Sequence, residues 1–171
     1  MAPSLNTFRL AQGTTLLLSS FSSGVSLAFS CVLVPRLLES PSDIMLTQWL
    51  HTYALGAATM PLAAAATTAG YIFLGLRTPG ISLFRSRMYL AAGALTVGIV
   101  PYTVLVMRGT NNRLRALEER ASAKTVELPA PEVRAEEERT AKGLVDWWGV
   151  LNLGRTGLLV AGAVCGLVAA L

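Results

Sequence analysis

Charged residues are scarce in this chain: they make up 14% of its 171 residues, whereas hydrophobic residues make up 53%. Ordinary soluble domains contain about 25% charged residues, which cover the surface that faces water. Because this chain has too little charge to cover a globule of its size, its composition predicts a surface that faces lipid. The net charge is +4, but eight of the 14 Lys and Arg share residues 108–146 with eight of the ten acids. This mixture indicates solvated helices and excludes a nucleic-acid-binding stripe.

Histidine and cysteine are also rare, since the chain contains one His (His51) and two Cys (Cys31 and Cys165). A bis-histidine haem, a histidine-box di-iron centre and a disulfide-relay reductase each need more of these residues or a CxxC motif. The sequence also has no nucleotide-binding loop or nucleophile elbow. We therefore expect any enzymatic reaction to proceed without a tightly bound metal or organic cofactor. We expect both cysteines to be small buried thiols.

Four long apolar runs predict four membrane-spanning helices, at about residues 13–34, 53–76, 88–107 and 147–171. A hydrocarbon layer of about 30 Å needs about 20 residues of helix, and each run is long enough to cross it. The first run is too long for a signal peptide, and it ends in Pro35 and Arg36 rather than in a small-residue cleavage site.

A polar helical hairpin is predicted at about residues 110–146, where charged helix formers are interrupted by Leu128-Pro129-Ala130-Pro131. Residues 1–171 are thus predicted to form a single membrane domain. We expect an all-α, integral membrane four-helix bundle with up-down topology and a charged helical extension between the third and fourth helices.

Small residues predict where these helices pack. The first span carries Ser19, Ser23, Ser26 and Ser30 at helical spacing, and the fourth carries Gly162 and Gly166. Helices associate in lipid through such residues. The two glycines also leave room for a homo-oligomer.

In an up-down bundle, the polar ends of all four spans gather at one membrane face. Trp148, Asn152 and Arg155 are spaced i, i+4, i+7 on one helix stripe, with Arg155 roughly 10 Å below Trp148. A buried Arg costs several kcal/mol in lipid unless it faces the bundle, so Arg155 indicates function rather than a snorkelling side chain. A second stripe carries Thr103, Met107, Thr110 and Asn111. Together with the start of the second span, these stripes predict a pocket for a small molecule.

Several of these residues also have ordinary structural interpretations. Trp49, Tyr53, Tyr102 and Trp148 could form the aromatic belt of a membrane protein. Arg36 and Glu39 could be a solvated pair, and a lone His such as His51 is more often structural than catalytic.

A series of motifs runs in order along nearly the whole chain: Pro35-Arg36…Glu39, Trp49…Tyr53…Gly56…Pro61, Pro101-Tyr102-Thr103…Met107…Thr110-Asn111…Leu114, and Leu144-Val145…Trp148…Asn152…Arg155. The stretch around Thr110-Asn111 and the Trp-x3-Asn-x2-Arg motif are the most specific. This series resembles the small four-span membrane family that contains the fungal anthrone oxygenases, also called noranthrone monooxygenase-like, whose members are mostly catalogued as a domain of unknown function. Other members of that family have no assigned activity.

The resemblance implies a fungal monooxygenase that oxidises a polyketide-derived anthrone, such as emodin anthrone, to the anthraquinone with O₂ and no cofactor. Loss of a proton from an anthrone gives an electron-rich anthrolate that can react with O₂ directly. The protein would supply a base, a partner for the oxyanion and a flat apolar slot.

On this reading the catalytic residues are His51, Asn152 and Arg155. His51 is expected to be the base because an imidazole titrates near neutral pH, with Tyr53, Tyr102 or Glu39 as alternatives. Asn152 and Arg155 would hold the oxyanion. The expected substrate-binding residues are Trp49, Tyr53, Tyr102, Thr103, Met107, Thr110, Asn111 and Trp148.

Two other functions remain open. A non-catalytic tetraspan scaffold or assembly protein would bind a partner through the charged segment and fill the space around Arg155 with its own side chains. A carrier of a small apolar or anionic molecule would use Arg155 as a counter-ion, but the opposite half of the bundle is mostly Ala, Gly, Val and Leu.

The site face has nine Lys and Arg outside the bilayer against four on the other face. This count indicates a cytosolic site face. The resemblance implies the endoplasmic reticulum membrane.

Overall fold

The computed structural model describes residues 4–78, 82–123 and 131–171, and these residues form helices with no strand among them. The first membrane helix consists of α1 (Leu5–Ala28), the π-helical turn η1 (Phe29–Leu33) and α2 (Val34–Leu38). The second is α3 (Ser42–Arg77). The third consists of α4 (Leu83–Val97), α5 (Ile99–Tyr102), the π-helical turn η2 (Thr103–Met107) and α6 (Arg108–Ala123), and the fourth is α7 (Pro131–Ala170).

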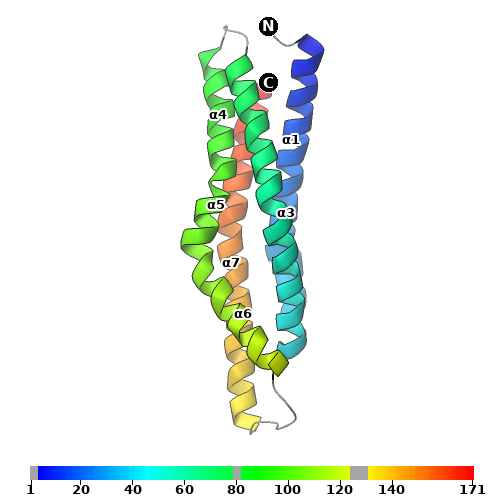
Figure 1. Cartoon of the computed structure of the whole chain (residues 1–171), viewed down its shortest axis with the longest axis vertical. Helices are drawn as coiled ribbons and strands as arrows, with labels where there is room; N and C mark the ends of the chain where they lie inside the picture. Colours follow the sequence, from blue (N-terminus) through cyan, green and yellow to red (C-terminus); the bar gives the residue numbers. More distant parts are fainter. Residues whose placement is uncertain (1–3, 79–81, 124–130) are drawn as a thin grey trace.

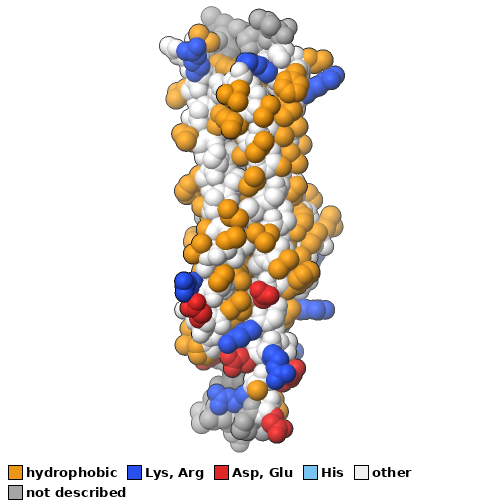
Figure 2. All heavy atoms as spheres, turned by 180° about the vertical axis from the view of Figure 1, so that it is seen from behind, with side chains coloured by type: hydrophobic (Ala, Val, Ile, Leu, Met, Phe, Trp, Pro, Cys, Tyr) orange, Lys and Arg blue, Asp and Glu red, His pale blue; other side chains and the backbone are white. Residues whose placement is uncertain are grey.

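The four membrane helices run up and down in a single elongated bundle (Figure 1). Each is long and apolar enough to cross a membrane. Figure 2 shows an apolar middle zone, acidic side chains only toward one end, and Lys and Arg toward both ends. Large apolar side chains are exposed on all four membrane helices, and such a surface is stable only in contact with lipid. The chain is therefore an integral membrane protein, and the predicted all-α membrane bundle is confirmed.

The second membrane helix begins earlier than the apolar run indicated. α3 begins at Ser42, directly after Pro41, and carries Asp43 in its first turn, where a negative charge interacts favourably with the helix dipole. The helix itself therefore begins about three turns before residue 53, where the predicted membrane span starts. As a result, Trp49 and His51 lie inside a helix rather than in a connection.

The third membrane helix continues into the charged extension, as its sequence predicted. α6 lies across the end of the bundle and reaches the start of α3 (Figure 1). Its buried Leu114 belongs to one apolar core with Met45, Leu46 and Val145, which come from α3 and α7. α6 ends at Ala123 and α7 begins at Pro131, whereas Leu128 to Ala130 lie outside the described residues. The extension therefore closes the polar end of the bundle.

The serine face of the first helix packs as predicted. Ser19, Ser23 and Ser26 are buried, and the hydroxyl groups of Ser26 and Thr156 are hydrogen bonded at 2.8 Å. Ser30 donates to the carbonyl of Gly149 at 2.9 Å. These contacts join α1 and η1 to α7.

The two glycines of the fourth helix also pack inside the bundle. A methyl group at Gly166 would collide with the ring and hydroxyl of Tyr71, and one at Gly162 would lie 2.9 Å from the Thr96 hydroxyl oxygen. These glycines admit side chains of α3 and α4 and so pack within the bundle; the homo-oligomer for which the sequence leaves room stays a prediction.

The expectation of two buried thiols also needs correction. Cys31 is exposed on the lipid side of η1, where an apolar thiol needs no burial, and Cys165 is partly buried. Both are free, so neither takes part in a disulfide.

The third helix bends away from α3 in its middle (Figure 1). Pro101 lies in α5, directly before η2, and has no N–H to donate to the carbonyl four residues earlier. η2 accommodates one additional residue in a wider turn. α3 packs against α4 on one side of this bend and against α6 on the other, but makes few contacts with α5 and η2. The bend thus leaves space between the second and third helices.

Candidate functional site

A cavity of about 200 Å³ lies at the bend of the third helix. It is lined by Phe29 of η1, by a face of α3, by the α5–η2 segment with the start of α6, and by two residues of α7. The α3 residues are Thr52, Tyr53, Gly56, Ala57, Met60 and Pro61; those of the third helix are Ile99, Val100, Thr103, Val104, Met107 and Asn111; those of α7 are Trp148 and Arg155.

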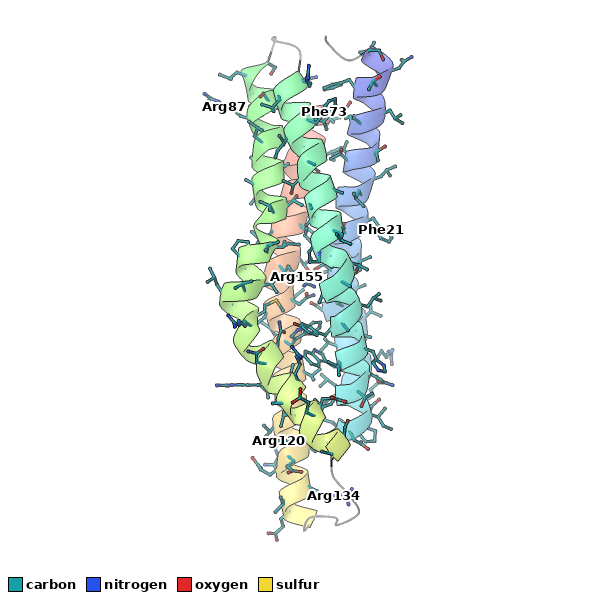
Figure 3. All side chains as sticks on the ribbon, viewed as in Figure 1. Phe21, Phe73, Arg87, Arg120, Arg134 and Arg155 are labelled. Carbon is teal, nitrogen blue, oxygen red and sulfur yellow. The ribbon has the colours of Figure 1, made fainter. Side chains whose placement is uncertain are left out.

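Arg155 is a buried cation with no hydrogen bond or ion pair to any residue that the structure describes. Its side chain lines the cavity and is only 9% exposed, near the middle of α7 and far from Arg87 and Arg134 at the two ends (Figure 3). The Nε atom is buried and has no hydrogen-bond partner. No described carboxylate pairs with its guanidinium. Since an unpaired charge is costly at this depth, the geometry favours an anionic or strongly polar ligand beside it.

Asn111 and Trp148 form a hydrogen bond at the same wall of the cavity. The indole Nε1 of Trp148 donates to Oδ1 of Asn111 at 3.0 Å, and both side chains are buried. Because the amide oxygen is occupied by the indole, the amide NH₂ group is the part of Asn111 that is left for a ligand. The cavity wall therefore offers hydrogen-bond donors from Arg155 and Asn111.

Trp49 supports the aromatic residues of the cavity from behind. It is fully buried, stacks on Tyr53 with ring centroids 5.2 Å apart and meets Trp148 edge-on at 6.0 Å. Such ring contacts hold aromatic side chains in fixed orientations. Tyr53 and Trp148 line the cavity, whereas Trp49 does not, so its expected place in the wall is corrected.

His51 does not reach the cavity. Its side chain is exposed on the outer face of α3, whereas its neighbours Thr52 and Tyr53 line the cavity. Successive helical residues are rotated by about 100°, so an early start of α3 turns His51 outward. The expected position of His51 in the site is corrected. Glu39, an alternative base, is also exposed and forms a 2.8 Å ion pair with Arg36 outside the cavity.

Asn152 joins two helices instead of lining the cavity. Its Nδ2 donates to the carbonyl of Ser26 at 2.8 Å and to the hydroxyl of Ser30 at 2.9 Å. Its Oδ1 is buried without a partner. Because an oxygen acceptor cannot stabilise an oxyanion, this orientation is incompatible with the role expected for Asn152.

Tyr102 and Thr110 also lie outside the cavity lining. The hydroxyl of Tyr102 donates to the carbonyl of Leu151 at 2.9 Å, and its ring occupies the space above Gly154. Thr110 is partly buried but has no surface in the cavity. Tyr102 directly precedes η2, and Thr110 comes after it. The wide turn of η2 changes the helix face on which these flanking residues lie.

Six of the expected residues do line the cavity: Tyr53, Thr103, Met107, Asn111, Trp148 and Arg155. The lining residues missed from the sequence are mostly small or apolar, such as Ala57, Ile99 and Val104. Nothing in the sequence distinguishes them from residues that face lipid. Gly56 and Pro61 did stand out in the motifs, but only as markers of a resemblance.

The lining contains no His, Cys, Asp or Glu. Within the described part of the chain, no group of three or more such residues lies close enough to hold a metal ion. The donor set consists of hydroxyl, phenol, amide, indole and guanidinium groups, which suit an oxygen-bearing aromatic ligand better than a metal.

Comparison with known proteins identifies relatives over most of the chain. The family described as anthrone oxygenase matches residues 49–165. An anthrone oxygenase of Claviceps purpurea is 36% identical over 85% of this chain and 80% of its own length. An anthrone oxygenase of Paecilomyces divaricatus is 30% identical over 91% of this chain and 92% of its own length. An anthrone oxygenase of Aspergillus fumigatus is 34% identical over 87% of this chain and 86% of its own length. No solved structure matches the chain.

Proposed function

This chain belongs to the anthrone oxygenase family, and on that basis we propose that it oxidises a polyketide-derived anthrone to the anthraquinone with O₂. The fold places one cavity with polar groups at its inner wall inside the membrane bundle. A tricyclic anthrone is flat and apolar, with oxygen atoms at its edges. Its rings therefore match the apolar lining of the cavity, and its oxygen atoms match the polar groups at the inner wall.

The unpaired guanidinium of Arg155 carries this proposal. Its charge is buried at the cavity wall, and no carboxylate among the described residues pairs with it. An anthrone that loses its methylene proton places the negative charge largely on the oxygen opposite. Arg155 and the amide NH₂ of Asn111 would hold that oxygen, and they would stabilise the anthrolate more than the neutral anthrone. Asn111 thereby takes the role first expected for Asn152.

Tyr53, as the phenolate, is our candidate for the proton acceptor, and the phenol formed by proton abstraction would return that proton to the peroxide. Among the described residues that line the cavity, Tyr53 and Arg155 carry the ionisable side chains. The ring of Tyr53 is held by Trp49 against the cavity. Of the alternatives to His51, Tyr53 alone reaches the cavity, because Tyr102 is bonded to Leu151 and Glu39 lies outside.

The anthrolate would then react with O₂ in a sequence that needs no other oxidant. The carbanion transfers one electron to O₂, and the two radicals combine to form a C–O bond. Protonation gives a hydroperoxide at the former methylene carbon. Loss of the remaining C–H proton with cleavage of the O–O bond gives the new carbonyl group and one water molecule. One anthrone and one O₂ thus yield one anthraquinone and one water.

We further propose that this reaction is independent of a cofactor, since the cavity's donor groups hold and orient an aromatic oxygen compound. A fungal endoplasmic reticulum membrane, with the site end toward the cytosol, is the proposed location. The scaffold alternative is disfavoured because the space around Arg155 is hollow rather than filled by side chains. The carrier alternative is disfavoured because Tyr71, Leu74, Tyr89 and Ala92 pack tightly in the other half of the bundle.

The test is conversion of emodin anthrone by the purified protein in lipid nanodiscs containing EDTA. We expect quinone absorbance to rise under air and not under argon, faster than in empty nanodiscs. With ¹⁸O₂, one labelled atom should enter the quinone. Arg155→Met should lower kcat roughly 100- to 1,000-fold, as loss of an oxyanion donor does.

His51→Ala is the matched control, since this side chain lies outside the cavity, and it should keep the wild-type rate. Equal rates for wild type, Arg155→Met and empty nanodiscs would refute the proposed function. A large loss in His51→Ala with Arg155→Met active would refute the assignment of residues.

A further inference from the structure

One side of the cavity is formed by residues that are themselves exposed at the molecular surface. Ala57 and Pro61 on α3 and Val100 and Val104 on the third helix line the cavity and are exposed. Ala57 and Pro61 lie on α3, and Val100 and Val104 lie on the α5–η2 segment, where these two parts of the chain separate at the bend. These four residues, here called the rim, therefore surround an opening.

The rim lies at the depth of the hydrocarbon layer. The third helix has no charged residue between Arg87 and Arg108, and Val104 lies one helical turn, roughly 6 Å, from Arg108. Directly beside the rim, Leu62 is 73% exposed and Leu105 is 82% exposed. Such side chains are stable in contact with lipid tails, so the opening faces lipid rather than water.

The aqueous end of the bundle offers no comparable entrance among the described residues. There α6 packs across α7 and reaches the start of α3, and Met45, Leu114 and Val145 are completely buried between these three helices. Trp49 fills the layer between this core and the cavity. A ligand arriving from water would have to separate α6 from the bundle.

We propose that the substrate enters this cavity sideways from the bilayer through the rim, and that the product leaves by the same opening. This inference rests on the proposed function for the identity of the substrate. An anthrone dissolved in lipid enters uncharged, with its oxygen-bearing edge leading toward Arg155 and Asn111, and its rings remain between the apolar residues of the rim. The substrate class is therefore restricted to flat, membrane-soluble anthrones, and glycosylated anthrones are excluded.

The size of the side chain at position 104 tests the route. We expect turnover of emodin anthrone in nanodiscs to fall from wild type through Val104→Phe to Val104→Trp, with at least a tenfold loss in Val104→Trp. Leu105→Trp is the matched control, because the adjacent side chain points into lipid outside the cavity. It should remain within twofold of wild type. Elution of each variant as a single folded species in detergent checks that the bundle is intact.

A second measurement separates entry from chemistry. Under argon, emodin should bind without turnover and quench the tryptophan fluorescence of the protein, to which Trp148 at the cavity wall contributes. Its association rate should follow the mole fraction of emodin in the lipid and should fall in Val104→Trp. Unchanged association and turnover in Val104→Trp would overturn the lateral route while leaving the proposed function intact. If emodin associates more slowly with Val104→Trp but the wild-type protein does not oxidise emodin anthrone, the lateral route would be supported and the proposed function refuted.

Discussion

Arg155 and Asn152 lie three residues apart on α7 but have different surroundings. Asn152 donates both amide hydrogens to α1 and η1, whereas the guanidinium of Arg155 has no described partner. A polar group bonded to a neighbouring helix contributes to stability, and an unpaired charge at a cavity contributes to ligand binding. The two residues can therefore be separated experimentally.

Replacing Asn152 by Ala removes two hydrogen bonds between helices. Such bonds in membrane proteins contribute about 0.6 kcal/mol on average and at most about 1.7 kcal/mol each. We expect Asn152→Ala to lower the free energy of unfolding by about 1–3 kcal/mol, measured by SDS titration in mixed micelles, while turnover per folded molecule stays within a few-fold.

Thr59→Ala is the matched control for this substitution, because Thr59 bonds only to Leu55 within its own helix. Its unfolding should match that of wild type. Loss of turnover in Asn152→Ala with no loss of stability would instead restore Asn152 to the chemistry.

Single residues also show how far sequence reasoning extends. Arg155 was identifiable from sequence because a charge within an apolar span has few stable positions, all of them facing the interior or a wet cavity. His51 was misplaced because its direction depends on the helix start at Ser42, eleven residues before the apolar run begins. Polar character alone could not determine on which face of the helix it lies.

At the scale of elements, the two π-helical turns shape the cavity. η1 supplies Phe29, and η2 supplies Thr103, Val104 and Met107. The length of each apolar run and the charged residues at its ends predicted the four membrane helices. The π-helical turns could not be predicted from those signals, because one additional residue in a helix leaves hydropathy unchanged.

Deleting Leu105 tests the role of η2. A π-helical turn holds one residue more than an α-helical turn, so removing one residue allows continuous α-helix with the flanking segments still aligned. Leu105 faces lipid, and its deletion removes no cavity side chain. We expect the third helix to approach α3 and the cavity to shrink, with turnover reduced at least tenfold and thermal stability maintained or raised.

The matched control for the deletion is Leu105→Ala, which keeps the chain length and should keep activity. A deletion variant as active as Leu105→Ala would show that the π-helical turn does not create the site.

For the whole molecule, the charges at the two ends differ in kind. Among the described residues, the end opposite the site carries Arg9, Arg77, Arg85 and Arg87 and no acid, whereas the site end carries eight Lys and Arg and nine acids. Orientation follows the count of Lys and Arg near the membrane more closely than net charge. The count therefore predicts that the site end, with α6 and the start of α7, faces the cytosol.

Cysteine labelling in sealed endoplasmic reticulum vesicles tests this orientation. In a variant without Cys31 and Cys165, Arg134→Cys and Arg87→Cys place one thiol at each end of the bundle, and both side chains are exposed (Figure 3). A membrane-impermeant maleimide should label Arg134→Cys in intact vesicles and Arg87→Cys only after detergent is added. The reverse pattern would show that net charge, not the number of basic residues, orients this bundle. Because the rim opens to the lipid rather than to either aqueous phase, the supply of substrate to the cavity should be the same in both orientations.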